Sequence, residues 1–338
     1  MTAAREELQR ISLCEAIYRW EERQRKRLRR CSLRNCGGAY VMCGKFFAHL
    51  ALKSALGALV LAAPAGDLRG EETNSNVRPP GLVNISTRLQ SAAGDRSLFG
   101  GFIITGTAPK RVLIRALGPS LGLSGILPDP VLYLLDSRGN EIGYNNSWRQ
   151  DEQAVQATGI PPSDDREAAL VVALAPGFYT ARVDDIQTRT GIALVEIYDL
   201  GTIGSDDPGA ARLAELSSRG WVKTGDNVMF GGFIIEGETT RVIVRAIGPS
   251  LPPFTGNVNN LADPTLELFN SDGSLITSND DWRSDQEQAI TETGVPPSDD
   301  RESAIVAVLN PGNYTSIVRG KNGQTGIGVV EVYDLTHR

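Results

Sequence analysis

Clustered carboxylates are the residues best suited to chemistry here, because histidine and cysteine are nearly absent from the larger part of the sequence. The two histidines are His49 and His337, and all four cysteines precede residue 44. Nucleophilic Ser-His-Asp or Cys-His mechanisms and zinc sites with His or Cys ligands are therefore not available within residues 66–336. The sequence also lacks a phosphate-binding loop, a dinucleotide fingerprint and an H-E-x-x-H motif.

Two acidic segments have the composition of an acid and base pair. The same residue types recur as Asp164, Asp165 and Glu167, and as Asp299, Asp300 and Glu302. Glycosidases place two such carboxylates on either side of the scissile bond. Their clefts usually carry several aromatic side chains, whereas aromatic residues make up 6% of this chain. A carboxylate-based polysaccharide hydrolase or lyase is therefore the alternative to a non-catalytic protein.

A third group of oxygen-bearing side chains is typical of a calcium site. Asn279, Asp280 and Asp281 are consecutive, and Asp285 follows about one turn later. Calcium prefers clustered oxygen ligands in a loop. The alternative is that these side chains cap a hairpin and a helix start. The first copy of this motif has Asn145–Ser147, with fewer charges, so we expect calcium mainly in the second copy.

Two tryptophans and two arginines complete the candidate residues. Trp148 and Trp282 are ligand-stacking candidates for a sugar, although a tryptophan beside a hairpin more often covers the core. Arg115 and Arg245 each interrupt an apolar strand, so each needs a carboxylate partner. We predict structural ion pairs of Arg115 with Glu167 and of Arg245 with Glu302. The alternative partners are Glu196 and Glu331.

An internal repeat positions all of these residues. Five blocks recur at an offset of 130 to 135 residues: LFGGFIITG and MFGGFIIEG, RVLIRALGPSL and RVIVRAIGPSL, GIPPSDDREAA and GVPPSDDRESA, PGFYT and PGNYT, and GIALVEIYDL and GIGVVEVYDL. The small differences in offset place insertions in loops between fixed core segments. We predict repeat 1 at 82–200, a linker at 201–212 and repeat 2 at 213–338.

The fold prediction is all-β, with two tandem antiparallel β-sandwich, jelly-roll-like domains after an N-terminal signal segment. In the second copy the strands are expected at 213–219, 229–236, 240–247, 265–270, 274–278, 303–309, 313–319 and 326–333. Ser271–Gly273 forms a tight hairpin turn, and Ser284–Thr293 forms a short helix with an S-x-x-E capping box. The paired glycines of GGFII indicate a bulge or close packing rather than phosphate binding.

The repeated blocks resemble a module found at the C-terminal ends of large secreted proteins of environmental bacteria. It is similar in plan to bacterial pre-peptidase C-terminal β-sandwiches. The resemblance rests on the GGFII-G, RAxGPSL, NDDW, PGxYT and EVYDL motifs, and it covers about three quarters of the chain. It implies a β-sandwich fold and export from the cell, without a settled activity. The second copy departs from it by opening with LAELSSR, where the first has LVNISTR.

The N-terminal region indicates export. Residues 42–65 have a positively charged start, an apolar centre and an A-x-A-like end, which is the pattern of a signal peptide. Their apolar stretch is too short to span a bilayer. Residues 1–41 are a basic leader, which suggests that Met42 is the true initiator; an unusually long signal start is the alternative. Residues 66–81 read as a polar linker.

The charge of residues 66–338 limits the classes of partner that the chain is expected to bind. Residues 66–338 carry 22 Lys and Arg against 35 Asp and Glu, so a nucleic-acid partner is not expected. We predict a secreted, cell-surface or periplasmic protein that binds or spaces, with a cell-surface or polysaccharide ligand and no cofactor other than a candidate calcium ion. The oligomeric state is left open.

Overall fold

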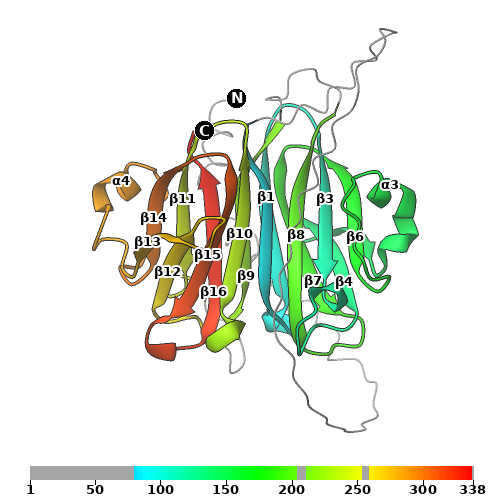
Figure 1. The fold of residues 1–338 in the computed structure, drawn as a ribbon, viewed down its shortest axis with the longest axis horizontal. Helices are drawn as coiled ribbons and strands as arrows, with labels where there is room; N and C mark the ends of the chain where they lie inside the picture. Colours follow the sequence, from blue (N-terminus) through cyan, green and yellow to red (C-terminus); the bar gives the residue numbers. More distant parts are fainter. Residues whose placement is uncertain (1–79, 204–210, 253–258, 337–338) are drawn as a thin grey trace, which may run out of the picture.

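The computed structural model describes residues 80–203, 211–252 and 259–336, which include both repeats (Figure 1). These residues form an all-β sandwich with a few short helices, which confirms the predicted fold class. The expected leader (1–41), the signal segment (42–65) and linker residues 66–79 lie outside the described residues. In the described ranges, no helix has the length and apolar character needed to cross a bilayer.

Within the described residues, each repeat contributes eight strands and one short α-helix. The first repeat has β1 (Gly81–Ser91), β2 (Leu98–Gly106), β3 (Lys110–Leu117), β4 (Pro130–Asp136), β5 (Glu141–Asn145), α3 (Glu152–Gln156), β6 (Ala168–Leu174), β7 (Gly177–Asp185) and β8 (Gly191–Thr202). The second has β9 (Ala211–Val222), β10 (Met229–Glu236), β11 (Thr240–Ile247), β12 (Pro264–Phe269), β13 (Leu275–Asn279), α4 (Glu287–Thr291), β14 (Ser303–Leu309), β15 (Gly312–Gly320) and β16 (Gly326–Asp334). Every strand predicted for the second copy is present, with ends that differ by at most three residues.

Two four-stranded sheets form each repeat. In the first repeat the orders are β6-β3-β8-β1 and β5-β4-β7-β2. In the second they are β14-β11-β16-β9 and β13-β12-β15-β10. All of these pairings are antiparallel. Helices α3 and α4 lie at the two far ends of the molecule (Figure 1).

The sheets continue from one repeat into the other. Strand β1 pairs with β10, and β2 pairs with β9, and we call these two pairings the junction. Each sheet of one repeat is thereby extended by a sheet of the other into a run of eight strands. The sequence predicts two sandwiches separated by a linker at 201–212, but β8 extends to Thr202 and β9 already begins at Ala211. The structure is one continuous body.

Close packing at the junction and inside the first repeat explains the paired glycines. A Cβ atom on Gly232 of β10 would lie 2.5 Å from Ser86 Oγ on β1, across the junction, and one on Gly100 of β2 would lie 3.1 Å from Ile197 Cδ1 on β8 of the same repeat. A single hydrophobic core also runs through the junction, because residues of both repeats, such as Phe102 and Phe233, belong to the same buried cluster. The close-packing interpretation of GGFII is therefore correct.

Of the two local predictions for the second repeat, the hairpin turn is confirmed and the helix capping box is wrong. The Ser271–Gly273 hairpin turn is present, with Gly273 at φ +76°. The helix is shorter than expected and has no capping box: the Ser284 hydroxyl donates to the Asp281 carbonyl at 2.6 Å, and Glu287 pairs with Arg283. The capping prediction is wrong because Gln286, at φ +59°, turns the backbone just before α4 begins.

Candidate functional site

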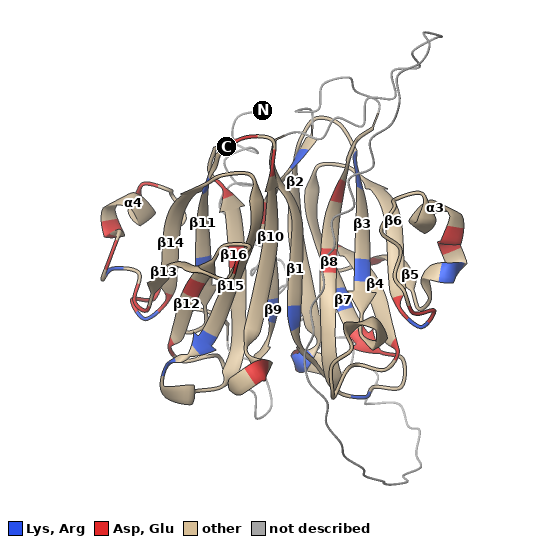
Figure 2. Cartoon of the chain, in the orientation of Figure 1, with Lys and Arg blue, Asp and Glu red and all other residues tan. Residues whose placement is uncertain are grey.

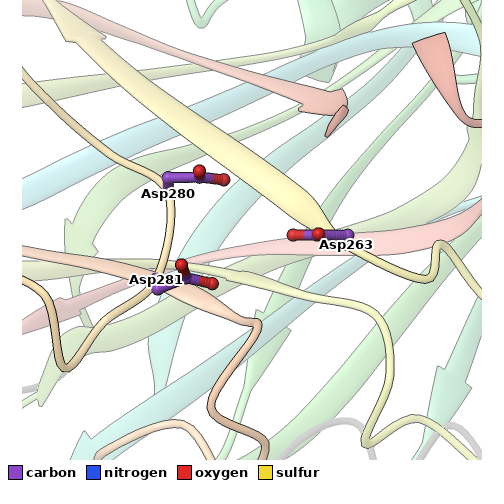
Figure 3. A group of neighbouring side chains, drawn as sticks. All are labelled: Asp263, Asp280 and Asp281. Carbon is purple, nitrogen blue, oxygen red and sulfur yellow. The ribbon is translucent and has the colours of Figure 1, made fainter. Parts of the chain in front are cut away.

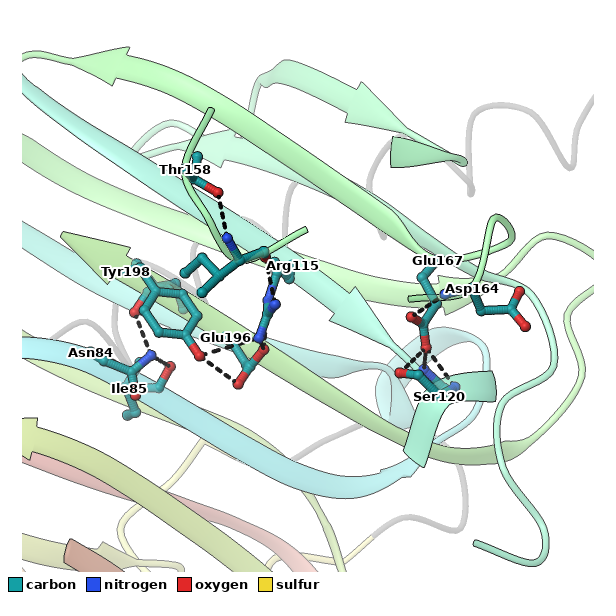
Figure 4. A network of polar contacts seen from close by, with 12 residues as sticks. Asn84, Ile85, Arg115, Ser120, Thr158, Asp164, Glu167, Glu196 and Tyr198 are labelled. Atoms are coloured by element: carbon teal, nitrogen blue, oxygen red, sulfur yellow. Dashed lines mark hydrogen bonds and ion pairs between the residues drawn. The ribbon is translucent and has the colours of Figure 1, made fainter. Parts of the chain in front are cut away.

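A partly buried arginine network joins β3 and β8 of the first repeat (Figure 4). Arg115 on β3 donates from Nε to Glu196 Oε2 at 2.8 Å and also contacts Glu196 through Nη2. Its Nη1 donates to the Ile160 carbonyl at 2.6 Å. The Tyr198 hydroxyl donates to Glu196 Oε1 at 3.0 Å and accepts from the guanidinium at 3.2 Å. Burial, together with the charge of Glu196, raises the pKa of Tyr198 to about 12.

The second repeat reproduces this network. Arg245 Nε donates to Glu331 Oε2 at 2.8 Å, Nη1 donates to the Val295 carbonyl at 2.7 Å, and Nη2 donates to the Tyr333 hydroxyl at 2.9 Å. Burial alone would lower the pKa of Arg245, but the neighbouring groups Glu331, Tyr333 and Glu215 together outweigh burial and raise that pKa. Every guanidinium nitrogen has an acceptor, as a buried charge requires.

The predicted partners of the two arginines are wrong, and the alternatives Glu196 and Glu331 are correct. Strand register is the reason. Arg115 lies directly opposite Glu196 in the β3–β8 pair, whereas its neighbour on β6 is Ala169. Glu167 precedes β6 and lies beyond that register. Arg245 is opposite Glu331 in the same way.

Glu167 and Glu302 instead bind a backbone turn. Glu167 Oε1 accepts from the Gly118 and Ser120 amides, both at 2.9 Å, and from Ser120 Oγ at 2.6 Å (Figure 4). Glu302 holds the corresponding turn of the second repeat. Both glutamates are fully buried. The G-P-S part of the RAxGPSL motif therefore forms a turn around a carboxylate from a distant segment.

The other acids considered for catalysis form ion pairs with arginines. Asp164 pairs with Arg166 at 2.7 Å and Asp165 with Arg149 at 2.8 Å. Asp299 and Asp300 repeat this arrangement with Arg301 and Arg283. A hydrogen bond from Arg166 lowers the pKa of Asp164, and one from Arg301 lowers the pKa of Asp299. A general acid needs the opposite shift, so this geometry does not favour acid catalysis.

Both tryptophans belong to the core. Trp148 and Trp282 are each 3% exposed. Trp282 packs against Ile243, Ile290 and Ala304, and Trp148 occupies the matching place in the first repeat. The guanidinium carbon of Arg283 lies 4.1 Å from the Trp282 ring centroid, and Arg149 covers Trp148 at 4.0 Å. Neither ring presents a face to a sugar, so the core interpretation is correct and the stacking interpretation is wrong.

An acidic cluster does form near the predicted calcium site, with different members (Figure 3). One carboxylate oxygen from each of Asp263, Asp280 and Asp281 lies within 4.8 Å of the others. Asp263 precedes β12, and its contribution was missed because the aspartates are separated by 17 residues. Burial is the largest influence on the pKa of Asp263 and raises it. The charge of Lys321 opposes this rise, and the charges of Asp280 and Asp281 add to it.

Lys321 supplies a cation to this cluster. Its Nζ atom lies 2.7 Å from Asp280, 3.7 Å from Asp263 and 4.0 Å from Asp281. The hydrogen bond to Asp280 raises the pKa of Lys321. Because one ammonium already faces all three carboxylates, a calcium ion would have to displace it.

The remaining two residues of the predicted calcium site are placed elsewhere. Asn279 donates from Nδ2 to the Asp281 carbonyl at 3.1 Å and accepts from the Ala304 amide at 3.0 Å, so its side chain is used in the fold. Asp285 is exposed and is not part of the acidic cluster. The prediction of these two as ligands is wrong, because both oxygen-bearing groups point to other partners or to solvent.

One further charged pair was missed by sequence reasoning. Lys110 Nζ lies 2.8 and 2.7 Å from the two carboxylate oxygens of Asp199, and both side chains are fully buried. The signal was a lysine at the start of an apolar strand. Figure 2 shows Lys, Arg, Asp and Glu residues of both signs along the strands of both repeats, in the loops and beside α3 and α4.

Comparisons with known proteins do not assign this chain to a family. No protein-family model and no curated protein matches the sequence. A chain described as "Crystal Structure of the STIV MCP" is similar, with 13% identity and a TM-score of 0.22. The similarity covers 76% of this chain and 89% of that chain. At this identity and TM-score it indicates neither a ligand nor an activity.

Proposed function

We propose that this chain is an exported, non-catalytic binding and spacer protein, acting in adhesion or carbohydrate attachment at a cell surface or on a polysaccharide. The observation that carries the proposal is that the main carboxylates of both repeats are used in structural contacts. Glu196 and Glu331 neutralise the strand arginines, Glu167 and Glu302 hold backbone turns, and Asp199 pairs with Lys110. These carboxylates serve the fold, because each one pairs with a cation or accepts hydrogen bonds from a backbone turn.

The continuous sheets support the spacer role. At the junction, seven residue pairs join β1 to β10 and eight join β2 to β9. The two repeats cannot rotate relative to each other without breaking these ladders and opening the shared core. The chain therefore holds the far ends of its two repeats at a fixed separation, as a spacer must.

The first repeat offers an aromatic surface for a sugar. Tyr144 on the edge strand β5 is 41% exposed, and its ring centroid lies 5.1 Å from that of Tyr133 on β4. The Arg182 guanidinium carbon lies 4.1 Å from the Tyr133 centroid. Aromatic faces beside hydrogen-bond donors suit the apolar face and hydroxyls of a sugar ring. Glu267 and Ser278 occupy the matching positions in the second repeat, so we place binding in the first.

A glycan and polysaccharide binding screen on the exported chain, residues 66–338, tests this function. We expect binding that Tyr144→Ala weakens at least tenfold, while the matched Ser278→Ala variant binds as the parent does. No binding to any glycan would refute carbohydrate attachment. Turnover of a polysaccharide that disappears in Asp165→Asn would instead establish the hydrolase or lyase alternative.

A further inference from the structure

The two halves of the junction are related by an approximate twofold axis. On β1, Ile85 is paired with Phe233 of β10, and on β9, Leu216 is paired with Phe102 of β2. Leu216 and Phe233 are the repeat counterparts of Ile85 and Phe102, at an offset of 131 residues. Each repeat therefore presents the same two strands in the same register, which is the definition of an isologous interface.

The side chains at the junction follow the same symmetry. The Arg88 guanidinium carbon lies 4.0 Å from the ring centroid of Phe230, and that of Arg219 lies 4.1 Å from the ring centroid of Phe99. Each contact joins an arginine of one repeat to a phenylalanine of the other. The irregularity in strand register also recurs, because Val83 is skipped between Leu82 and Asn84 on β1 and its counterpart Ala214 is skipped between Leu213 and Glu215 on β9.

Recognition at the junction does not depend on the two repeats sharing one chain. The contacts are main-chain ladders, closely packed glycines, a continuous apolar core and two cation–π pairs. All of these are available to an identical strand pair supplied by another molecule. The strands before and after the connection also end close together, since Thr202 Oγ is 3.5 Å from the Ala211 carbonyl oxygen.

We propose that the junction is a binding surface for a second copy of this chain. Two chains exchange repeats, so that the first repeat of each pairs with the second repeat of the other. The exchanged dimer contains two junctions with the same contacts as the two separate chains. It gains no new interface, so its population is set by chain concentration against the effective concentration within one chain, on the order of millimolar for a short connection.

This inference goes beyond the proposed function, because it names a partner without requiring a glycan. Exchange gives the spacer a means of joining two chains. Once formed, the dimer returns to separate chains only by opening both strand pairs of a junction. It is therefore expected to form during folding at high local concentration and to persist afterwards.

Cysteine pairing across the junction tests the exchange. Ser86 on β1 is opposite Gly232 on β10, and a Cβ on Gly232 would lie 2.5 Å from the Ser86 oxygen, so cysteines there are close enough for a disulfide. Two full chains, with the four native cysteines replaced by serine, carry either Ser86→Cys or Gly232→Cys. They are unfolded together, refolded at increasing concentration, and then oxidised.

A disulfide between these two chains forms only if the junction assembles in trans. We expect its yield to rise with concentration and to exceed at least tenfold that of a control mixture of Thr265→Cys and Arg319→Cys chains. The control positions are opposite each other on β12 and β15 within one repeat. One chain carrying both Ser86→Cys and Gly232→Cys establishes that the pair can bond. If that chain bonds while the mixture stays at the control level, exchange does not occur and the proposal is overturned.

Discussion

The two repeats have corresponding strands, but at one buried strand position the first repeat has a charged residue and the second has a neutral one. Lys110 in the first repeat forms a fully buried pair with Asp199. The matching strand position in the second repeat is Thr240, also fully buried, and its hydroxyl donates to the Glu238 carbonyl at 3.1 Å. The Arg-Glu-Tyr network and the glutamate-bound turn occur in both repeats. The shared groups thus belong to the module, and the others distinguish one copy from the next.

Removing the lysine is expected to give the largest difference between the repeats. Lys110→Met leaves the Asp199 carboxylate buried without its ammonium, which destabilises the chain by about 3–5 kcal/mol. Thr240→Val removes only a neutral hydrogen bond and costs about 1 kcal/mol. Denaturant unfolding of both variants measures the contrast. Adding Asp199→Asn to Lys110→Met should restore part of the loss, and equal losses in the two single variants would refute this comparison.

The arginine network occurs in both repeats, but its contribution to stability should be larger in the second repeat than in the first. The Arg245 and Glu331 side chains are 9% and 0% exposed, whereas those of Arg115 and Glu196 are 13% and 9% exposed. Arg245→Met should therefore cost about 3 kcal/mol, and Arg115→Met less. The same unfolding measurement tests the partner: combining Arg245→Met with Glu331→Gln should be non-additive by about 1 kcal/mol or more, whereas combining it with Glu302→Gln should be nearly additive. Additivity with Glu331→Gln would contradict the pairing.

The tyrosine of the first network adds a dependence on alkaline pH. The pKa of Tyr198 in the folded chain is raised from its usual value of 10.0 to about 12. A raised folded pKa means that the neutral form is stabilised by folding. This stability is therefore complete below about pH 10 and is lost as the pH rises towards 12. Tyrosinate absorbance should show a contribution titrating near pH 12 that is absent in Tyr198→Phe. Denaturant unfolding should show a steeper loss of stability near pH 11 in the parent than in that variant. Identical titrations would contradict it.

Local pattern was enough to predict the strands, but partners set by register were not predictable from it. Short β-rich runs bounded by turn-forming residues predicted the strands of the second copy to within a few residues. The choice between Glu167 and Glu196 for Arg115 depended on which strand lies beside β3, and the sequence does not carry that information locally. The junction was missed for a related reason, because a repeat reveals that two units are alike without indicating which edges they pair.

The candidate sites show the same limit. Asp280 and Asp281 were recognised because they are adjacent in the sequence, whereas Asp263 and Lys321 come from segments far apart and only the fold brings them together. Trp148 and Trp282 were correctly assigned to the core from their large apolar area. Asp285 was included by helical spacing, but the segment before α4 does not continue as a helix.

A single inserted residue makes the outer edges of the two repeats differ. Gln286 has no counterpart in the first repeat, where the sequence passes from Asp151 directly to Glu152. Its side chain donates to the Val306 carbonyl at 3.1 Å and accepts from the Val306 amide at 3.0 Å, which covers the free edge of β14 as a neighbouring strand would.

Gln286→Ala should therefore cost about 1 kcal/mol and increase the solvent exchange of the Val306 amide. Hydrogen exchange of Val306, compared with Val171 at the matching position of β6, measures the effect. We expect Val306 to exchange more slowly than Val171 in the parent chain and at a similar rate in the variant. Unchanged protection of Val306 in Gln286→Ala would show that the side chain does not cover the edge.

The smallest expected effect concerns calcium at the acidic cluster of the second repeat. The Lys321 ammonium already contacts Asp280 at 2.7 Å, so calcium added to the parent chain has to compete with it. Lys321→Met removes that competition and leaves three carboxylates whose mutual repulsion a divalent cation relieves. We expect this variant to bind calcium more tightly than the parent in calorimetry and to gain more in melting temperature. The first repeat has Ile186 at the matching position and Asn146 and Ser147 in place of the two aspartates, so Ile186→Met is the control. An equal calcium response in both variants would mean that Lys321 does not occupy the cation position.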